Sequence, residues 1–213
     1  MKAEQFLRCA CGHARGISLI EVLVSLVILS LGVLSVVALQ LVSKRNNTDA
    51  GQRTVAAQVV YDIIARMRAN STQTTLAAYL TGVEPVGRNT RGDTKPSPVC
   101  ETGSPCTAAE LIAHDLWVWE QALDGAAETV AAGKTGGLVL PTGCIAQTTD
   151  DGGGDGIYTI TIAWRGAVPI PDSRTGTAQC GRVGQPGNSS GLYGAQDEFR
   201  RSISIPAYIT ARR

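Results

Sequence analysis

Histidine is almost absent from this chain of 213 residues, which contains only His13 and His114. Neither lies in a serine or cysteine motif that would form an activated nucleophile, and no glycine-rich phosphate-binding motif occurs. An excess of one charge is lacking too, since 19 basic residues face 18 acidic ones. A nucleic-acid binder would show a basic patch or stripe. We therefore expect neither an enzyme nor a direct nucleic-acid contact, and we expect His114 to be a partly exposed helix residue.

Motifs for metals and cofactors are missing as well. Cys9 and Cys11 lie close together near the amino terminus, but no downstream ligand set completes a metal site. The acidic turn at residues 150–155 offers carboxylate oxygens, yet it lacks the spacing and the closing glutamate of an EF-hand. We therefore interpret this acidic segment as a solvated turn and not as a calcium site. We expect no metal and no cofactor.

Proline is absent from the first 70 residues, because all nine prolines follow them. Within this part, the 26 residues from Ile17 to Val42 form an apolar run that carries a single charge, Glu21. As a helix the run is ~39 Å long at ~1.5 Å per residue, which is enough to span a ~30 Å hydrocarbon core. A lone carboxylate costs about 2.5–3.5 kcal/mol at the centre of such a helix and less near its end. We expect Glu21 to have a partner.

The leader, residues 1–16, carries charges but no apolar core, and it ends in Gly16. A secretory signal places its apolar region before the cleavage site, whereas here the apolar run follows the glycine. A cut after Gly16 therefore leaves the whole helix on the product and makes Ile17 the new amino terminus. The alternative is an uncleaved single-span anchor in which Gly16 has no role.

Four of the six cysteines follow the apolar run: Cys100, Cys106, Cys144 and Cys180. Four cysteines in a small domain favour disulfides, and disulfides favour an oxidising compartment. This predicts a periplasmic carboxyl-terminal domain and a cytoplasmic leader, although basic residues flank both ends of the run and do not themselves set the orientation. Of the three possible pairings we predict the most local one, Cys100–Cys106 with Cys144–Cys180.

Residues 43–70 are predicted to continue the helix beyond the membrane run of residues 17–42. Their apolar side chains recur at helical spacing, at Ala56, Val60, Ile63 and Met67. Asp62 and Arg66 stand four residues apart, which favours a pair worth ~0.2–0.5 kcal/mol. The polar residues 46–51 are the place where we expect a bend or break.

Residues 71–213 are predicted to form a globular domain with one helix and three strands. A capping box, Thr107 with Glu110, starts a helix whose apolar face holds Leu116, Trp119 and Leu123. Strands are expected at 137–147, 157–165 and 199–208, the first two joined as an antiparallel pair by a turn at 148–156. In the second strand one face is predicted to hold Tyr158, Ile160, Ile162 and Trp164. Loops are expected at 82–106 and at 166–196, the latter anchored by Cys180.

The stretch from Gly16 to Val22 resembles the signature of the type IV prepilin and pseudopilin family: a glycine, an apolar first mature residue and a glutamate four places later. Ile17 departs from the usual phenylalanine or methionine. The resemblance implies that a prepilin peptidase cuts between Gly16 and Ile17 and methylates the amine of Ile17. It also implies that Glu21 pairs with the amino terminus of a neighbouring subunit, since two charges that are costly alone become tolerable together.

For the fold, the resemblance implies a pilin-like α+β class, in which a long amino-terminal helix packs on a small antiparallel sheet with a disulfide-tied carboxyl-terminal region. For function it implies a minor pilin that enters or primes the pilus and so supports twitching motility and adhesion. The expected partners are other minor pilins, the major pilin, a tip adhesin and the inner-membrane assembly platform. The expected location is the inner membrane, in a single pass, and then the pilus fibre at the cell surface.

Two alternatives remain open at this point. A pseudopilin of type II secretion would share the same amino-terminal mechanism. A pilin-like subunit that itself binds a ligand or DNA belongs to another functional class, which a basic stripe with exposed aromatic residues would favour. Aromatic residues make up only 5% of the chain, and no such stripe is seen.

Overall fold

The computed structural model describes residues 16–82, 84–100, 105–126, 128–130, 133–134, 136–170, 179–185 and 191–212. Residues 1–15 of the predicted leader, with Cys9, Cys11 and His13, lie outside the described residues. The described chain divides into two compact units, one ending at Arg45 and the other beginning at Asn46. Each unit is described by itself.

The helix α1, Leu19–Ala69, runs through both units without interruption. The break expected at residues 46–51 is therefore wrong. Gly51 costs only about 1 kcal/mol relative to alanine in an exposed helix. This is too little to interrupt the backbone hydrogen bonds of a helix that continues on both sides. The hydroxyl of Thr54 donates to the carbonyl of Ala50 (3.1 Å) and so stays within the helix.

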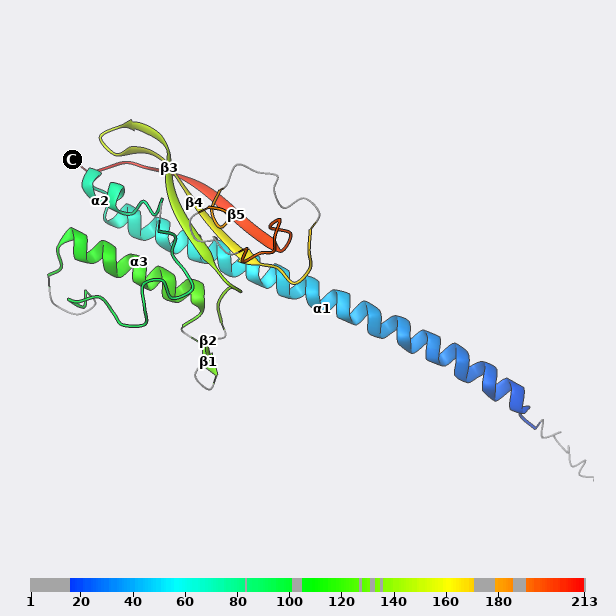
Figure 1. The fold of residues 1–213 in the computed structure, drawn as a ribbon. Coiled ribbons are helices and arrows are strands. Elements are labelled where there is room, and N and C mark those ends of the chain that lie inside the picture. The colour runs from blue at the N-terminus through cyan, green and yellow to red at the C-terminus, as the bar shows by residue number, and fades with distance from the viewer. Residues whose placement is uncertain are drawn as a thin grey trace, which may run out of the picture. The chain divides into compact units, whose positions relative to one another are not determined.

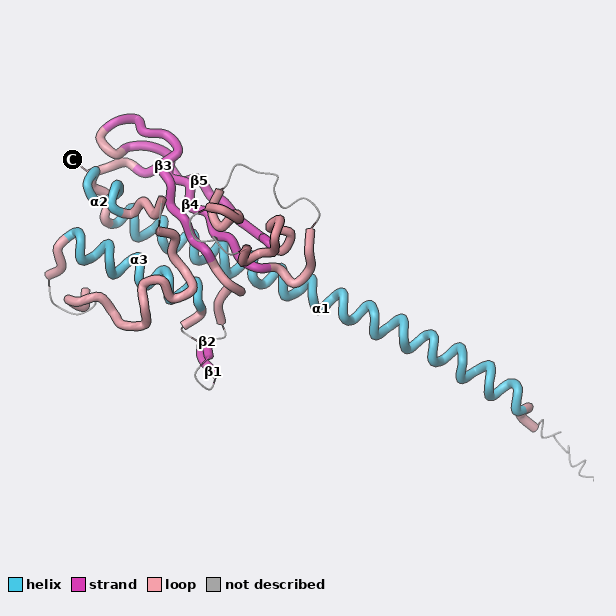
Figure 2. The backbone as a smooth tube through the Cα atoms, viewed as in Figure 1, coloured by secondary structure: helices cyan, strands magenta, loops and turns pink. Residues whose placement is uncertain are grey.

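The second unit is built around the part of α1 that follows residue 45. Three antiparallel strands in the order β3-β4-β5 lie over this part of the helix, and α3 runs beside it (Figures 1 and 2). They are β3, Thr142–Gly152; β4, Asp155–Arg165; and β5, Arg200–Ile209. The predicted apolar faces meet in one core, to which α1 contributes Ala56, Val60, Ile63 and Met67, and β4 contributes Tyr158, Ile160, Ile162 and Trp164. The expected α+β class is confirmed.

The first predicted strand is displaced along the sequence. β3 begins at Thr142 rather than at residue 137, because Pro141 has no N–H to donate and Leu140 has a positive φ of 51°. It then continues through the expected turn, where two register shifts accommodate residues 148–152. The hairpin turn itself is Gly153-Gly154, both with positive φ. The predicted turn at 148–156 is thus mostly strand.

The helix α3, Ala108–Asp124, begins with the predicted capping box of Thr107 and Glu110. The Thr107 backbone N–H and hydroxyl both donate to the Glu110 carboxylate and lower its pKa. Leu116, Trp119 and Leu123 enter the core, as predicted. The expectation for His114 is wrong, because its side chain is buried, with its ring 6.2 Å from that of Trp117.

Three short elements were not predicted from the sequence. The helix α2, Gln73–Ala78, follows α1 and has its own capping box, Thr72 with Thr75. The strands β1, Thr129–Val130, and β2, Gly133–Lys134, form a separate antiparallel pair. Elements of two to six residues carry too little periodicity to be recognised.

The two disulfides join the cysteines as the local pairing predicts, Cys100 to Cys106 and Cys144 to Cys180. The first closes a separation of 6 residues within one loop, whereas the second spans 36 residues and ties the described part of the 166–196 loop to β3. A longer closed loop restricts the unfolded chain more strongly.

Removing the second disulfide should therefore destabilise the domain more than removing the first. By chain-entropy arithmetic, replacing Cys144 and Cys180 together by alanine costs about 4 kcal/mol, against about 2 kcal/mol for Cys100 and Cys106. Urea unfolding of the full chain in detergent measures both values. Equal losses, or a larger loss for the shorter loop, would contradict this order.

Candidate functional site

The predicted processing residues lie immediately before the start of α1. Gly16, Ile17 and Ser18 precede the helix, and the carbonyl of Ser18 accepts from the backbone N–H groups of Glu21 (3.0 Å) and Val22 (3.3 Å). Glu21 therefore lies in the first turn. A carboxylate there is favoured by the helix dipole by about 0.3–1 kcal/mol. Among the described residues, no ion pair involves Glu21.

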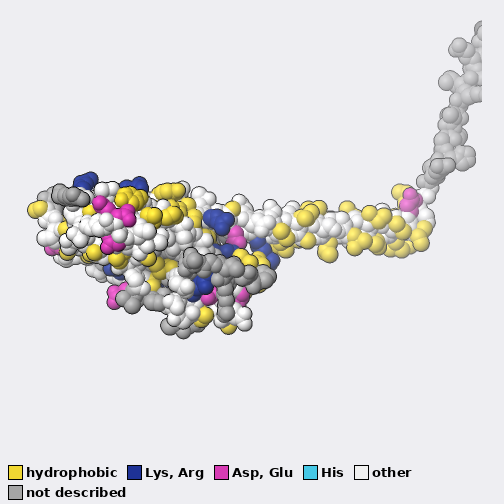
Figure 3. Space-filling model, turned by 90° about the horizontal axis from the view of Figure 1, so that it is seen from above, with side chains coloured by type: hydrophobic (Ala, Val, Ile, Leu, Met, Phe, Trp, Pro, Cys, Tyr) yellow, Lys and Arg dark blue, Asp and Glu magenta, His cyan; other side chains and the backbone are white. Residues whose placement is uncertain are grey.

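The helix that follows is apolar on every side. The leucine, isoleucine and valine side chains of α1 as far as Val42, with Ile17 just before it, are all between 45% and 77% exposed, and hydrophobic side chains gather along this segment in Figure 3. It is the one helix among the described residues that is long and apolar enough to cross a membrane. A surface of this kind needs lipid or other helices around it.

The serine hydroxyls in this segment bond to their own helix. Ser25 donates to the carbonyl of Glu21 (2.7 Å), Ser30 to that of Val27 (2.8 Å) and Ser35 to that of Leu31 (2.9 Å). In an apolar environment a polar group must find its partner within the protein. These three hydroxyls meet that condition without water.

In the second unit, charged side chains fasten α1 to α3. The predicted pair of Arg66 and Asp62 is present at 2.8 Å, but Arg66 also reaches the buried carboxylate of Asp115 on α3, at 3.0 Å. Tyr79 donates its hydroxyl to the same carboxylate (2.5 Å), and burial together with Asp115 raises the pKa of Tyr79. Asp115 thus joins three segments of the chain.

A second buried carboxylate, Glu120 on α3, holds the loop that follows α2. Its side chain is fully buried and accepts from the backbone N–H groups of Gly87, Thr90 and Arg91, at 2.7–2.9 Å, and from the Thr90 hydroxyl. This role of Glu120 was not predicted from the sequence. The signal was available, because Glu120 lies four residues after Leu116 on the apolar face of the helix.

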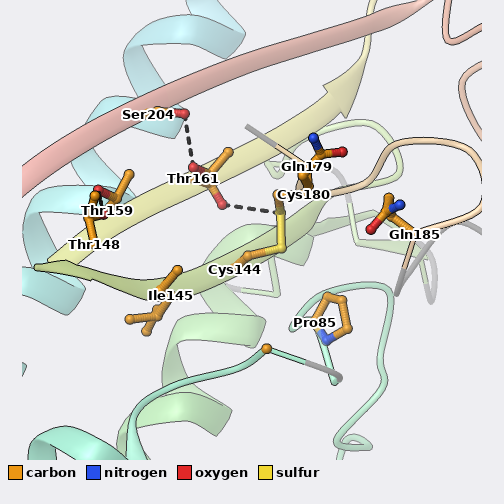
Figure 4. Close-up of a pocket in the computed structure, with 12 residues that line it drawn as sticks. Pro85, Cys144, Ile145, Thr148, Thr159, Thr161, Gln179, Cys180, Gln185 and Ser204 are labelled. Atoms are coloured by element: carbon orange, nitrogen blue, oxygen red, sulfur yellow. Dashed lines mark hydrogen bonds between the residues drawn. A yellow bond between two sulfur atoms is a disulfide. The ribbon is translucent and has the colours of Figure 1, made fainter. Parts of the chain in front are cut away.

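The outer face of the sheet carries a hollow of about 420 Å³ beside the disulfide of Cys144 and Cys180 (Figure 4). Its hydroxyls bond to one another, Thr161 to Ser204 at 2.9 Å and Thr148 to Thr159 at 2.6 Å. These four hydroxyls therefore satisfy each other, and Gln179 and Gln185 contribute the other polar side chains of the lining.

Within the described residues, no group of three or more acidic, histidine or cysteine side chains is placed to hold a metal ion. Of the three acidic residues in the 150–155 segment, Asp151 bonds to the Tyr208 side chain, and the other two accept from backbone N–H groups. Asp150 accepts from the N–H of Gly152 (2.9 Å), and Asp155 accepts from the N–H of Ala211 (2.6 Å).

Comparison with known proteins found two matching family models, on adjoining parts of the chain. Residues 11–37 match the prokaryotic N-terminal methylation motif, and residues 38–117 match the family described as Type IV pilin Tt1218. No curated protein matches the chain, and no solved structure does.

Proposed function

Since the chain carries a type IV pilin domain directly after an N-terminal methylation motif, we propose that it is a minor type IV pilin. It enters or primes the pilus, and it supports twitching motility and adhesion through pilus assembly. The observation that carries the proposal is the apolar helix that begins at Leu19 and bears one carboxylate in its first turn. A helix apolar on every side suits first a membrane and then the core of a filament.

The methylation motif implies processing by a prepilin peptidase and assembly with other pilins. In the proposed mechanism the peptidase cuts between Gly16 and Ile17 and methylates the new amine. Glu21 then pairs with the amino terminus of a neighbouring subunit as the helix leaves the membrane. The pairing is favourable because each charge alone is costly in apolar surroundings.

The choice of a minor pilin rests on a narrower resemblance, to the minor pilin PilV. It is carried by the apolar string from Leu23 to Leu34, by residues 65–70, and by Asp115, Trp117 and Trp119 on α3. We propose the inner membrane as the site of insertion, with residues 71–213 in the periplasm, and the pilus fibre as the destination. The two disulfides in that domain support the oxidising side.

The proposed role is structural, without catalysis or a cofactor. Its partners are other minor pilins, the major pilin, a tip adhesin and the inner-membrane assembly platform. A pseudopilin of type II secretion is the alternative within the same assembly chemistry. Fractionation separates the two, with an epitope-tagged full chain expressed in its own host and followed by immunoblotting. Recovery in sheared pili supports the proposal, whereas recovery only with secretion machinery contradicts it.

A further inference from the structure

A groove runs beside α3 on the second unit and adjoins the hollow on the sheet, with which it shares Gly82 and Pro85. It consists of two hollows of about 570 Å³ and 390 Å³ that share Glu84, Arg91 and Ala113 in their walls. The floor comes from α3 and is apolar, with Ala109, Ile112, Ala113, Leu116 and Trp117. The opposite wall is the loop that Glu120 holds.

This loop is shaped in advance of any contact with a partner. Besides the bonds to Glu120, the N–H groups of Arg88 and Asn89 each donate to Asp124 at 2.8 Å. Arg88 and Asn89 both have positive φ, near 60°. Such backbone costs on the order of 1–3 kcal/mol for each residue and persists where its surroundings hold it in place. Two carboxylates on one helix do so here.

The fixed loop presents charged side chains to the groove. Arg91 has its backbone N–H bound to Glu120, while its side chain is exposed. Among the described residues, neither the Arg91 guanidinium nor the Glu84 carboxylate takes part in an ion pair. Arg88 lines the larger hollow as well. The groove thus combines an apolar floor with one exposed cation, Arg91, and one exposed carboxylate, Glu84.

We propose that this groove binds a short extended segment of a partner protein in which an apolar side chain lies next to a carboxylate. The carboxylate pairs with Arg91, and the apolar side chain lies over Ala109 and Ala113. A nucleic-acid strand carries a negative charge on every phosphate, so Glu84, which lines both hollows, repels it more strongly than a segment with one carboxylate placed at Arg91. That the partner is another pilin subunit rests on the proposed function; the chemistry of the groove does not.

Photo-crosslinking in the intact host tests the proposal. Benzoylphenylalanine is placed in the full chain at Ala109, which is exposed and lines the groove, or at Ala108, which is exposed but does not line it. We expect a protein cross-link from position 109 that is at least tenfold stronger than from position 108. The cross-linked peptide, identified by mass spectrometry, should contain an aspartate or glutamate beside an apolar residue.

Charge variants in the background with the probe at position 109 separate recognition from loss of structure. Arg91→Gln should weaken the cross-link at least tenfold, since one charge of a pair is removed, whereas Glu84→Gln should strengthen it. A purely structural role for these side chains would lower both yields.

Equal cross-linking from the two positions, a nuclease-sensitive product, or a mapped segment without a carboxylate would overturn the proposal. If the cross-linked acidic segment belongs to a protein of a secretion system, the result would support binding in the groove and contradict the proposal that the chain is a minor pilin. Fractionation of the same cells tests the minor-pilin proposal independently of the cross-linking, which tests the groove.

Discussion

Replacing Glu21 by alanine should remove the chain from sheared pili while leaving its leader processing intact. In the filament, the variant would leave the amine of a neighbouring subunit charged and uncompensated among apolar helices. Losing one partner of a buried pair costs about 3–5 kcal/mol, which corresponds to a decrease on the order of 100-fold or more in incorporation. Immunoblotting of sheared pili measures incorporation, and the mass of the mature chain reports processing.

Two variants near Glu21 serve as controls. Ser25→Ala removes a hydroxyl that bonds only within its own helix, so incorporation should stay close to that of the original chain. Gly16→Ala should block cutting, so the leader stays attached and the full mass is retained. Incorporation of the Glu21→Ala chain at the level of the Ser25→Ala chain would refute the role of the carboxylate.

Local patterns in the sequence predicted much of this fold. The capping box of Thr107 and Glu110, the alternation from Tyr158 to Trp164 and the helical spacing from Ala56 to Met67 each involve residues a few positions apart. Their physical causes are equally local: a helix end needs acceptors, and a half-buried strand or helix needs one apolar face. Such features depend on neighbouring residues, so they can be predicted without knowledge of the tertiary structure.

Two of the wrong predictions, the turn at 148–156 and the exposure of His114, concern places where a local signal competed with a more distant contact. The acidic, glycine-rich segment after Gln147 has the composition of a turn, but pairing with β4 extends it as strand as far as Gly152. His114 is polar, but the surroundings of α3 bury it. Tertiary packing decides such cases, and single-residue propensity does not record it.

The groove beside α3 was beyond the reach of sequence patterns. Glu120 lies 29–33 residues from the backbone groups it binds, and no motif links the two segments. The amino-terminal site differs in this respect, because Gly16, Ile17 and Glu21 lie within six residues of one another. A motif confined to so few residues can be recognised in the sequence, whereas a groove built from distant segments needs the structure.

The dependence of the loop on Glu120 predicts a large loss of stability when this single side chain is truncated. Glu120→Ala leaves three backbone N–H groups and the Thr90 hydroxyl without their buried acceptor, which should cost about 3–5 kcal/mol. That is a large share of the 5–15 kcal/mol typical of a folded domain. Urea unfolding of the full chain in detergent measures the loss.

Two matched variants on the same helix test the cause of this loss. In Glu120→Gln, an amide oxygen at the position of Oε1 keeps three of the four bonds, but the amide nitrogen faces the N–H of Arg91, so the cost should be smaller, about 1.5–3 kcal/mol. Asp124→Ala removes a partly exposed acceptor of two N–H groups and should cost about 1 kcal/mol. Hydrogen exchange over residues 84–92 should accelerate in the same order, Glu120→Ala most. If Asp124→Ala destabilised the chain as much as Glu120→Ala, neither the burial of the Glu120 carboxylate nor its larger number of bonds would be the cause of the loss.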